Sequence, residues 1–293
     1  MKRKKNLRDI GTFLFFGGPS IFAFFAVVLI PLIFGLYFTF TNWDVQTGNQ
    51  TFIWFANYKE AFSDKEFLTQ LLFTMKYVLF TVIIANVGAF ILGIVLTRGI
   101  KDQNFMRMGF FTPNLIGGLV LGYLWQFLFS QVLTYLGKSN GWALFQTSWL
   151  TDTNKAFWAL VIATAWQLMG YLMIVYIAGF TSVPNDVLEA ASIDGASELT
   201  KITKIILPLS IPAIVVCLFL SISRSFLTYD LNLGLTKGGP YGSTELASYH
   251  IVQKAFSSNK YGVGQAEAII LFVIVAGIAL TQAYLMKKRE VEA

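Results

Sequence analysis

The sequence predicts an all-α membrane protein with six transmembrane helices and both termini in the cytoplasm. Of its 293 residues, 55% are hydrophobic and only 13% are charged, about half the charged share of an ordinary soluble protein. The hydrophobic residues form six long blocks, and a helix needs roughly 20 apolar residues to cross a bilayer. Because backbone amides in lipid must be satisfied within a segment, and the blocks lack the alternation of a membrane barrel, each block should be a helix.

The six blocks set the expected boundaries of one membrane domain, residues 13–286. Before it lies a basic cytoplasmic amino terminus, residues 1–12, and after it a cytoplasmic carboxyl terminus, residues 287–293. The first block exceeds the 7 to 15 residues of a signal-peptide core and lacks a small-residue cleavage site, so it should remain as a helix. The predicted helices span residues 13–40, 71–97, 108–130, 157–180, 205–227 and 266–286.

Lysine and arginine are concentrated in the segments assigned to the cytoplasm. The inner segments include the basic runs 2–8 and 287–289 together with Arg98, Lys101 and Arg107, whereas the longer outer loops carry only scattered lysines. This asymmetry is the positive-inside pattern of membrane proteins. It explains the net charge of +6 without a nucleic-acid partner, since the charge is spread over loops.

The one long inner loop, residues 181–204, has the pattern of two short helices. Pro184 would lie in the first turn of the first helix, and Gly195 allows a turn that a side chain would obstruct. A second helix would begin near Ala196 and continue until Pro208 marks the bend into the membrane. The small residues of this loop permit close approach to another surface, so the loop is expected to dock.

The same loop resembles the EAA motif of importer permeases, EAA-x3-G-x9-I-x-L-P. The stretch EAASIDGASELTKITKIILP has the required residue at every fixed position of that motif. The matching residues are Glu189, Ala190, Ala191, Gly195, Ile205, Leu207 and Pro208. The stretch TKGGPYGSTELASYHIVQKAF, residues 236–256, is similar to the outer-loop signature of the carbohydrate-uptake branch. The chain thus resembles an ABC-type carbohydrate importer permease, closest to the first permease of maltose and multiple-sugar transporters.

The resemblance implies partners that this chain does not encode. In that family two permeases pair above a dimer of cytoplasmic ABC ATPases, and an extracytoplasmic binding protein delivers the sugar. The matching residues of the EAA motif would form a coupling helix that rests in a groove of the ATPase. ATP and Mg would be bound by the ATPase, and no cofactor by this chain. We therefore expect a multi-pass permease of a bacterial or archaeal cytoplasmic (inner) membrane that imports a sugar, an oligosaccharide.

Two stripes of polar and aromatic residues lie on the helices that flank the loop. Members of each stripe share one helical face, because they fall at positions i, i+3, i+4 and i+7. The stripes are Thr164, Gln167, Leu168 and Tyr171 in the fourth helix and Ser221, Arg224, Ser225 and Thr228 in the fifth. Such residues either line a path or form interhelical hydrogen bonds. In maltose permeases of the resembling family, positions at these distances from the motif line the sugar site.

Arg224 departs from the pattern of those permeases. A charged side chain inside the membrane is costly unless it faces a cavity or a partner. Arg224 would pair either with an acidic residue such as Asp230 or with an anionic group of the substrate. Weaker candidates for polar contacts inside the membrane are Asn86, Asn114 and Gln126.

The sequence carries no signature of an enzyme. The ATP-binding motif G-x4-G-K-[ST] is absent, so the chain should not hydrolyse ATP by itself. The lone His250 lies in an outer loop without zinc-ligand spacing or a nucleophile context, and we expect neither catalytic residues nor a metal site. The alternative function is an ion-coupled secondary sugar carrier. Such a carrier would bury proton or sodium relays, but the central helices hold no Asp, Glu or His, and Glu267 lies only near the start of the last helix.

Overall fold

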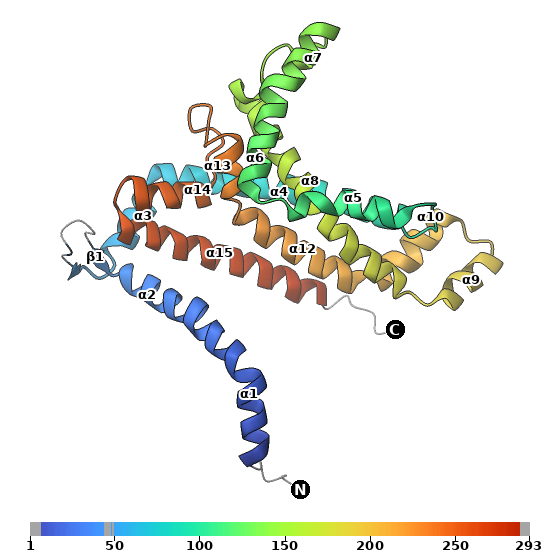
Figure 1. The fold of residues 1–293 in the computed structure, drawn as a ribbon, viewed down its shortest axis with the longest axis horizontal. Coiled ribbons are helices and arrows are strands. Elements are labelled where there is room, and N and C mark those ends of the chain that lie inside the picture. Colours follow the sequence, from blue (N-terminus) through green and yellow to red (C-terminus); the bar gives the residue numbers. More distant parts are fainter. Residues whose placement is uncertain (1–6, 44–47, 49, 288–293) are drawn as a thin grey trace. The chain divides into compact units, whose positions relative to one another are not determined.

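A computed structural model of the chain consists almost entirely of helices (Figure 1). The structure describes residues 7–43, 48 and 50–287, so of the predicted terminal segments 1–12 and 287–293, residues 1–6 and 288–293 lie outside the described part. Within the described part, five helices are long and apolar enough to cross a membrane, and there are six if one pair of helices, bent by 72°, is counted as a single span. They are Thr12–Phe38, Lys65–Val95, Gly118–Asn140, Thr153–Thr181, Tyr261–Met286 and the pair Glu198–Leu209 and Ile211–Phe226. The predicted helical membrane fold is confirmed.

The chain divides into two compact units, the first made of residues 1–65 and 251–270. In sequence order its elements are α1 (Leu7–Phe24), a π-helical turn (Phe25–Leu29), α2 (Ile30–Phe38), β1 (Thr41–Trp43), β2 (Gln50–Phe52), α3 (Ala56–Ser63), the end of α14 (Ala247–Val252), a second π-helical turn (Gln253–Ser257) and the first part of α15 (Tyr261–Lys287). β1 and β2 pair antiparallel, which is a small exception to the all-α prediction. The amide of Asn57 donates to the carbonyls of Thr39 and Thr41, at 2.8 and 2.9 Å, and so fixes α3 against the hairpin.

The second unit, residues 66–250 and 271–293, is built around three long helices. These are α4 (Lys65–Val95), α8 (Thr153–Thr181) and α12 (Ile211–Phe226). Their shared core contains small residues of α4 such as Ala85 and Ala89, larger residues of α8 such as Leu172, and the free thiol Cys217. Small side chains on one helix let the larger ones of its neighbour approach closely, as is usual where helices meet in a membrane.

The third predicted helix, residues 108–130, is not continuous in the structure. The chain instead forms α5 (Gln103–Leu115) and α6 (Gly118–Phe127), then a π-helical turn (Leu128–Val132) and α7 (Leu133–Asn140). Pro113 lies in the last turn of α5, and Ile116 and Gly117 are extended, with ψ of 130° and 137°. Proline and glycine both disfavour a continuous helix. The span therefore begins at Gly118.

Other helices differ from the prediction mainly at their ends. The second, fourth and last helices begin at Lys65, Thr153 and Tyr261, several residues before their apolar blocks. Apolar composition marks only the part of a helix inside lipid, so polar first turns escape it. The fifth helix bends by 72° at Ser210, between the prolines at 208 and 212. The predicted bend at Pro208 therefore lies two residues further along the chain.

The short helix α13 (Asp230–Leu235) packs against α6 at a pair of glycines. A Cβ atom on Gly122 would lie 2.8 Å from the Cα of Gly234, closer than real side chains allow. Gly118 and Gly122 thus allow α6 and α13 to pack closely, because a side chain at either position would meet α13. In the same unit α5 and α12 both pack on α8.

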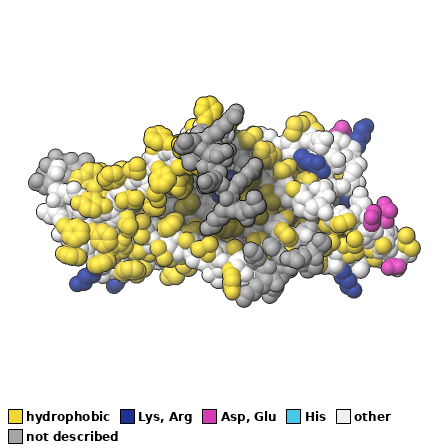
Figure 2. All heavy atoms as spheres, turned by 90° about the horizontal axis from the view of Figure 1, so that it is seen from below, with side chains coloured by type: hydrophobic (Ala, Val, Ile, Leu, Met, Phe, Trp, Pro, Cys, Tyr) yellow, Lys and Arg dark blue, Asp and Glu magenta, His cyan; other side chains and the backbone are white. Residues whose placement is uncertain are grey.

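Much of the apolar surface is left uncovered. Only 6% of the first apolar window and 17% of the window in Gly118–Asn140 are buried. In water such patches would drive aggregation, whereas lipid or partner helices can cover them. Figure 2 shows hydrophobic side chains over much of the drawn surface, while acidic side chains gather at the end formed by α9 (Asn185–Ile193) and α10 (Glu198–Lys201).

Candidate functional sites

The EAA loop, residues 181–204, forms two short helices as predicted. Gly195 lies between α9 and α10 with a φ of +75°, a conformation that residues with a side chain rarely adopt. Pro184 precedes α9 as its N-cap instead of lying in its first turn, and Ser197 caps α10 by accepting from the amide of Thr200. The positive φ of Gly195 therefore explains why the predicted turn requires a glycine at this position.

The motif residues lie along one continuous segment, but they do not converge on a single point. Glu189, Ala190 and Ala191 are in α9, Ile205 is in the π-helical turn Ile202–Ile206, and Leu207 and Pro208 are in α11 (Leu207–Leu209). The outer side of the loop exposes two large apolar side chains that the motif does not include. Ile193 is 86% exposed and Leu199 is 71% exposed. Both side chains are therefore accessible at the surface of the subunit.

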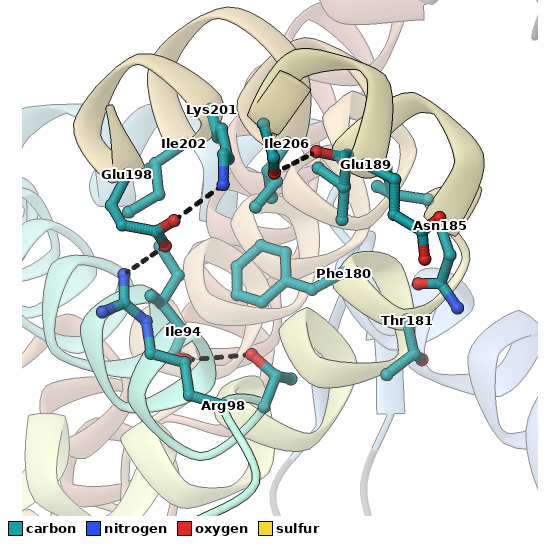
Figure 3. A pocket seen from close by; sticks show the side chains of 14 residues that line it. Ile94, Arg98, Phe180, Thr181, Asn185, Glu189, Glu198, Lys201, Ile202 and Ile206 are labelled. Carbon is teal, nitrogen blue, oxygen red and sulfur yellow. Dashed lines mark hydrogen bonds and ion pairs between the residues drawn. The ribbon is translucent and has the colours of Figure 1, made fainter. Parts of the chain in front are cut away.

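An ion-pair network ties the EAA loop to the end of α4. The carboxylate of Glu198 accepts a hydrogen bond from the Lys201 ammonium at 2.9 Å and lies 3.6 Å from the guanidinium of Arg98 (Figure 3). The hydrogen bond from Lys201, with smaller help from the charge of Arg98, lowers the pKa of this carboxyl below its ordinary value. Glu198 is therefore ionised at neutral pH.

A hollow of about 500 Å³ lies between this loop and the ends of α4 and α8 (Figure 3). We call it the loop cavity. Its wall contains the apolar side chains of Ile94, Phe180 and Ile206, and Figure 3 shows the charged Glu198 and Glu189 on opposite sides of Phe180.

A second hollow, of about 420 Å³, gathers most of the predicted path residues. We call it the polar cavity. Its lining comes from α5, α6, α8, the end of α12 and the start of α13, and consists of Asn114, Gly118, Thr164, Gln167, Leu168, Arg224, Leu227, Thr228, Tyr229, Asp230 and Leu231. Two helical stripes predicted from spacing thus meet at one cavity, joined by residues of three other helices.

Arg224 is held at the polar cavity by two neighbours. Its guanidinium lies 4.5 Å from the ring centroid of Tyr171, within the range of a cation–π interaction. It also donates a hydrogen bond of 2.9 Å to the side-chain oxygen of Asn114. Asp230 lines the same cavity, but among the described residues it forms no ion pair with Arg224.

Ser221 and Ser225 are placed differently from the rest of their stripe. Both are fully buried, and neither lines the polar cavity. Ser221 accepts a 2.9 Å hydrogen bond from the amide of Asn86, whose oxygen accepts another from the hydroxyl of Tyr176. The structure thus gives Ser221 the interhelical role, because the face of α12 that carries the serines turns toward α4.

His250 is a buried side chain and not an ordinary polar loop residue. It is 4% exposed, and its Nδ1 lies 3.1 Å from a carboxylate oxygen of Glu245. Together with Glu66, these two residues offer potential metal-ligand atoms within 4.8 Å of one another. This grouping could not be predicted from the sequence, since Glu66 is far from the other two residues along the chain.

Comparison with known proteins places the chain in a family. The model of the binding-protein-dependent transport system inner membrane component matches residues 85–291. The chain belongs to this family. It is therefore a membrane-embedded permease component of a transport system. The family predicted from the EAA motif is confirmed.

Two curated relatives are similar over nearly their whole length. The probable starch degradation products transport system permease protein AmyD of Thermoanaerobacterium thermosulfurigenes is 41% identical over 293 residues, 99% of each chain. The multiple sugar-binding transport system permease protein MsmF of Streptococcus mutans is 32% identical over 265 residues, 89% of this chain and 90% of that protein. Both are permease proteins, as the EAA motif indicated.

The fold is also similar to that of a solved transporter subunit. A chain of a bacterial ABC transporter that imports the acidic polysaccharide alginate superimposes with a TM-score of 0.82, at 19% identity, over 96% of this chain and 98% of that one. A second structure of an alginate ABC transporter, in complex with a periplasmic protein that holds an alginate pentasaccharide, gives a TM-score of 0.81. This family member therefore has the fold of an importer permease.

Proposed function

We propose that this chain is one of two permease subunits of an ABC importer for oligosaccharides released from starch. The polar cavity is the observation that carries the proposal. There a guanidinium lies over the ring of Tyr171, beside the amides of Gln167 and Asn114. The similarity to the starch-product permease AmyD over 99% of the chain supports the substrate class.

The chemistry of the cavity suits a saccharide. Sugar hydroxyls both donate and accept hydrogen bonds, and sugar rings carry apolar faces, so a sugar site combines a few fixed polar groups with apolar wall. Gln167 and Arg224 supply donors, Asp230 supplies an acceptor, and Leu168 with Leu227 supplies apolar surface. Because Arg224 and Asp230 carry opposite charges, the proposed substrate is neutral.

The residues proposed to contact the sugar are those predicted residues that border the cavity. They are Thr164, Gln167, Leu168, Arg224 and Thr228, together with Tyr171, whose ring lies against the guanidinium of Arg224. Thr164 and Thr228 are held in place by the hydroxyl of Tyr77, which lies 2.7 and 3.4 Å from their oxygens. We assign Ser221 and Ser225 to helix packing, so the proposed sugar path includes fewer residues than the two predicted stripes.

The EAA loop is the proposed attachment point of a cytoplasmic ATPase dimer. A partner can shift a transporter between two shapes only if its contacts differ between them, so the contact must be rigid and must move with the partner. Glu189, Ala190 and Ala191 on α9 and the apolar Ile193 beside them form an exposed surface of this kind. The Glu198 ion pairs would carry its movement to α4.

The remaining partners follow from the same reading of the site. The uncovered apolar surface would be shared between lipid of the cytoplasmic membrane and a second permease subunit. An extracytoplasmic binding protein would deliver the oligosaccharide, as a periplasmic protein does in the alginate transporter. ATP and Mg would bind to the ATPase alone.

The test is uptake by the assembled complex in proteoliposomes. With the binding protein outside and ATP inside, radiolabelled maltopentaose should accumulate, and Tyr171→Ala should reduce the initial rate at least tenfold. The matched control is Tyr37→Ala, which alters a tyrosine of α2 that is half exposed. Equal loss in both variants would contradict the proposed path.

The same assay separates the proposal from an ion-coupled sugar carrier. ATP depletion should abolish uptake, and an ionophore that collapses proton and sodium gradients should leave it unchanged. Uptake that survives without ATP and stops with the ionophore would replace the importer by the carrier.

A further inference from the structure

Tyr77 of α4 bonds to two threonines of the polar cavity that belong to other parts of the chain. Its side chain is fully buried, and its hydroxyl donates to the Oγ1 of Thr164 on α8 at 2.7 Å and lies 3.4 Å from the Oγ1 of Thr228, just after α12. Both threonines line the polar cavity, whereas Tyr77 lies behind them. One buried oxygen therefore contacts two residues of the cavity wall.

The directions of these hydrogen bonds determine what Thr228 offers to the cavity. A hydroxyl group has one hydrogen to donate and two lone pairs that accept. O–H···O bonds are ordinarily about 2.5–3.0 Å long, so the hydrogen of Tyr77 lies in its shorter bond, toward Thr164. The hydroxyl of Thr228 donates its own hydrogen to the carbonyl of Arg224 at 3.2 Å. Thr228 can therefore only accept from a ligand.

Thr164 is left in the opposite state, as a donor. Its oxygen accepts from Tyr77, and within the described part of the chain its own hydrogen is donated to no other group. Thr181 on the same helix, in contrast, donates to the carbonyl of Ile177 one turn earlier. Thr164 is only 3% exposed, and a buried hydrogen without an acceptor is destabilising. Because Thr164 borders the polar cavity, its acceptor has to come from the contents of that cavity.

A donor beside an acceptor matches the hydroxyls of a sugar, which both accept and donate. The two threonine oxygens lie near each other, since both are within 3.4 Å of the same Tyr77 oxygen. We propose that Tyr77 is a positioning residue for sugar binding: it directs Thr164 to donate to a saccharide unit and holds Thr228 to accept from it. The class of ligand rests on the proposed function. Tyr77 does not touch the sugar and acts through the two threonines.

Equilibrium binding of radiolabelled maltopentaose tests this role. The assembled complex is measured in lipid nanodiscs, and the binding protein is omitted so that only the complex can hold the sugar. Tyr77→Phe removes one oxygen at nearly unchanged shape and should raise the Kd about three- to tenfold, the effect of losing one hydrogen bond. Tyr77→Phe combined with Thr164→Val should bind about as weakly as Thr164→Val alone, because the tyrosine acts through this threonine.

Tyr176→Phe is the matched control. Tyr176 on α8 is also buried, at 2% exposed, and donates to the side-chain oxygen of Asn86 on α4 at 2.9 Å. Neither of these residues lines the polar cavity. If Tyr77 served helix packing alone, both tyrosine variants would lower the thermal unfolding midpoint and leave the Kd unchanged. We expect both to lower the midpoint and only Tyr77→Phe to raise the Kd.

The conservative change Thr164→Ser keeps the hydroxyl and should bind as the parent does, while Thr164→Val should bind more weakly. These two variants carry the test if Tyr77→Phe does not assemble, and equal binding by both would then overturn the inference. A Kd that Tyr77→Phe and Tyr176→Phe change equally also overturns it, while maltopentaose uptake by the parent would still support the proposed function. A parent complex that binds no maltopentaose without the binding protein overturns it as well, and the uptake assay then decides the proposed function separately.

Discussion

The guanidinium of Arg98 lies 3.6 Å from the carboxylate of Glu198, and this ion pair joins the end of α4 to the start of α10. Both side chains are about half exposed or more, at 49% and 65%. Exposed ion pairs contribute little to folding because solvent screens them. The value of this pair is geometric, since it connects the EAA loop to the turn that follows α4, at the wall of the loop cavity.

Removing the charge of Glu198 should therefore weaken coupling more than stability. We expect Glu198→Gln to lower sugar-stimulated ATP hydrolysis severalfold in the reconstituted complex while the thermal unfolding midpoint barely changes. The pKa of Glu198 is depressed, so its ion pairs persist at neutral pH and are lost as the pH falls through the folded-state pKa. A double-mutant cycle with Arg98→Gln is the control. Additive effects of the two changes would contradict a shared role.

Gly195 should be replaceable only by residues that accept its backbone conformation. Its φ is +75°, and no atom lies within 4 Å of a Cβ built there, so strain and not crowding limits substitution. Asparagine visits this region more readily than other residues, whereas a β-branched residue does so at a cost of about 1–2 kcal/mol. Gly195→Asn should keep ATP-dependent uptake and Gly195→Val should reduce it. The membrane content of each variant, measured by immunoblot, controls for insertion.

The sequence predicted the presence of the membrane helices better than their interruptions. Apolar length alone locates the spans, because a bilayer imposes that length on any crossing helix. The break at Ile116 escaped the prediction because the apolar run continues through Leu115, Ile116 and Leu119. What interrupts the helix is Pro113 followed by adjacent glycines, a local backbone effect that composition does not register.

Helical spacing identified only part of the candidate site. It found Gln167 and Arg224, which line the polar cavity from their own helices, and Tyr171, whose ring contacts Arg224. Spacing could not tell whether the serines of α12 face the cavity or a neighbouring helix. Residues of the same stripe contact both, since Arg224 lines the cavity and Ser221 bonds to Asn86 of α4. Asn114 and Asp230 come from other helices, and only the fold brings them to the cavity.

Ser221 and Tyr171 should behave oppositely when each is truncated. Ser221→Ala removes an interhelical hydrogen bond with Asn86, and such bonds in membranes stabilise by about 0.5–1 kcal/mol. We expect a slightly lower unfolding midpoint in detergent and an unchanged apparent KM for maltopentaose uptake. Tyr171→Ala should instead change uptake. A raised apparent KM for Ser221→Ala would instead indicate that Ser221 contacts the sugar.

The contact between α5 and α8 should be among the least tolerant in the protein. An alanine at Gly170 would place its Cβ against the backbone carbonyl of Phe110, and backbone cannot move aside as a side chain can. Gly170→Ala should therefore lower the unfolding midpoint by several degrees and reduce assembly. Gly109→Ala in α5 is the matched control, because nothing lies within 4 Å of its Cβ. A loss of equal size in both variants would contradict crowding as the cause, because alanine favours the helix over glycine at both positions.

The exposed apolar side chain of Ile193 should decide attachment of the ATPase. Ile193 is 86% exposed in the subunit alone, and burying it against a partner would stabilise the complex by about 1.5–3 kcal/mol. An aspartate there would have to lose its hydration on docking, so Ile193→Asp should lower recovery of the ATPase in affinity purification at least tenfold. Thr203→Asp adds the same charge at another exposed position of the loop, close to the basic side chains of Lys201 and Lys204, and should keep the ATPase. Full recovery with Ile193→Asp would place the docking contact elsewhere, because an unpaired carboxylate cannot be buried in an apolar contact without a large loss of affinity.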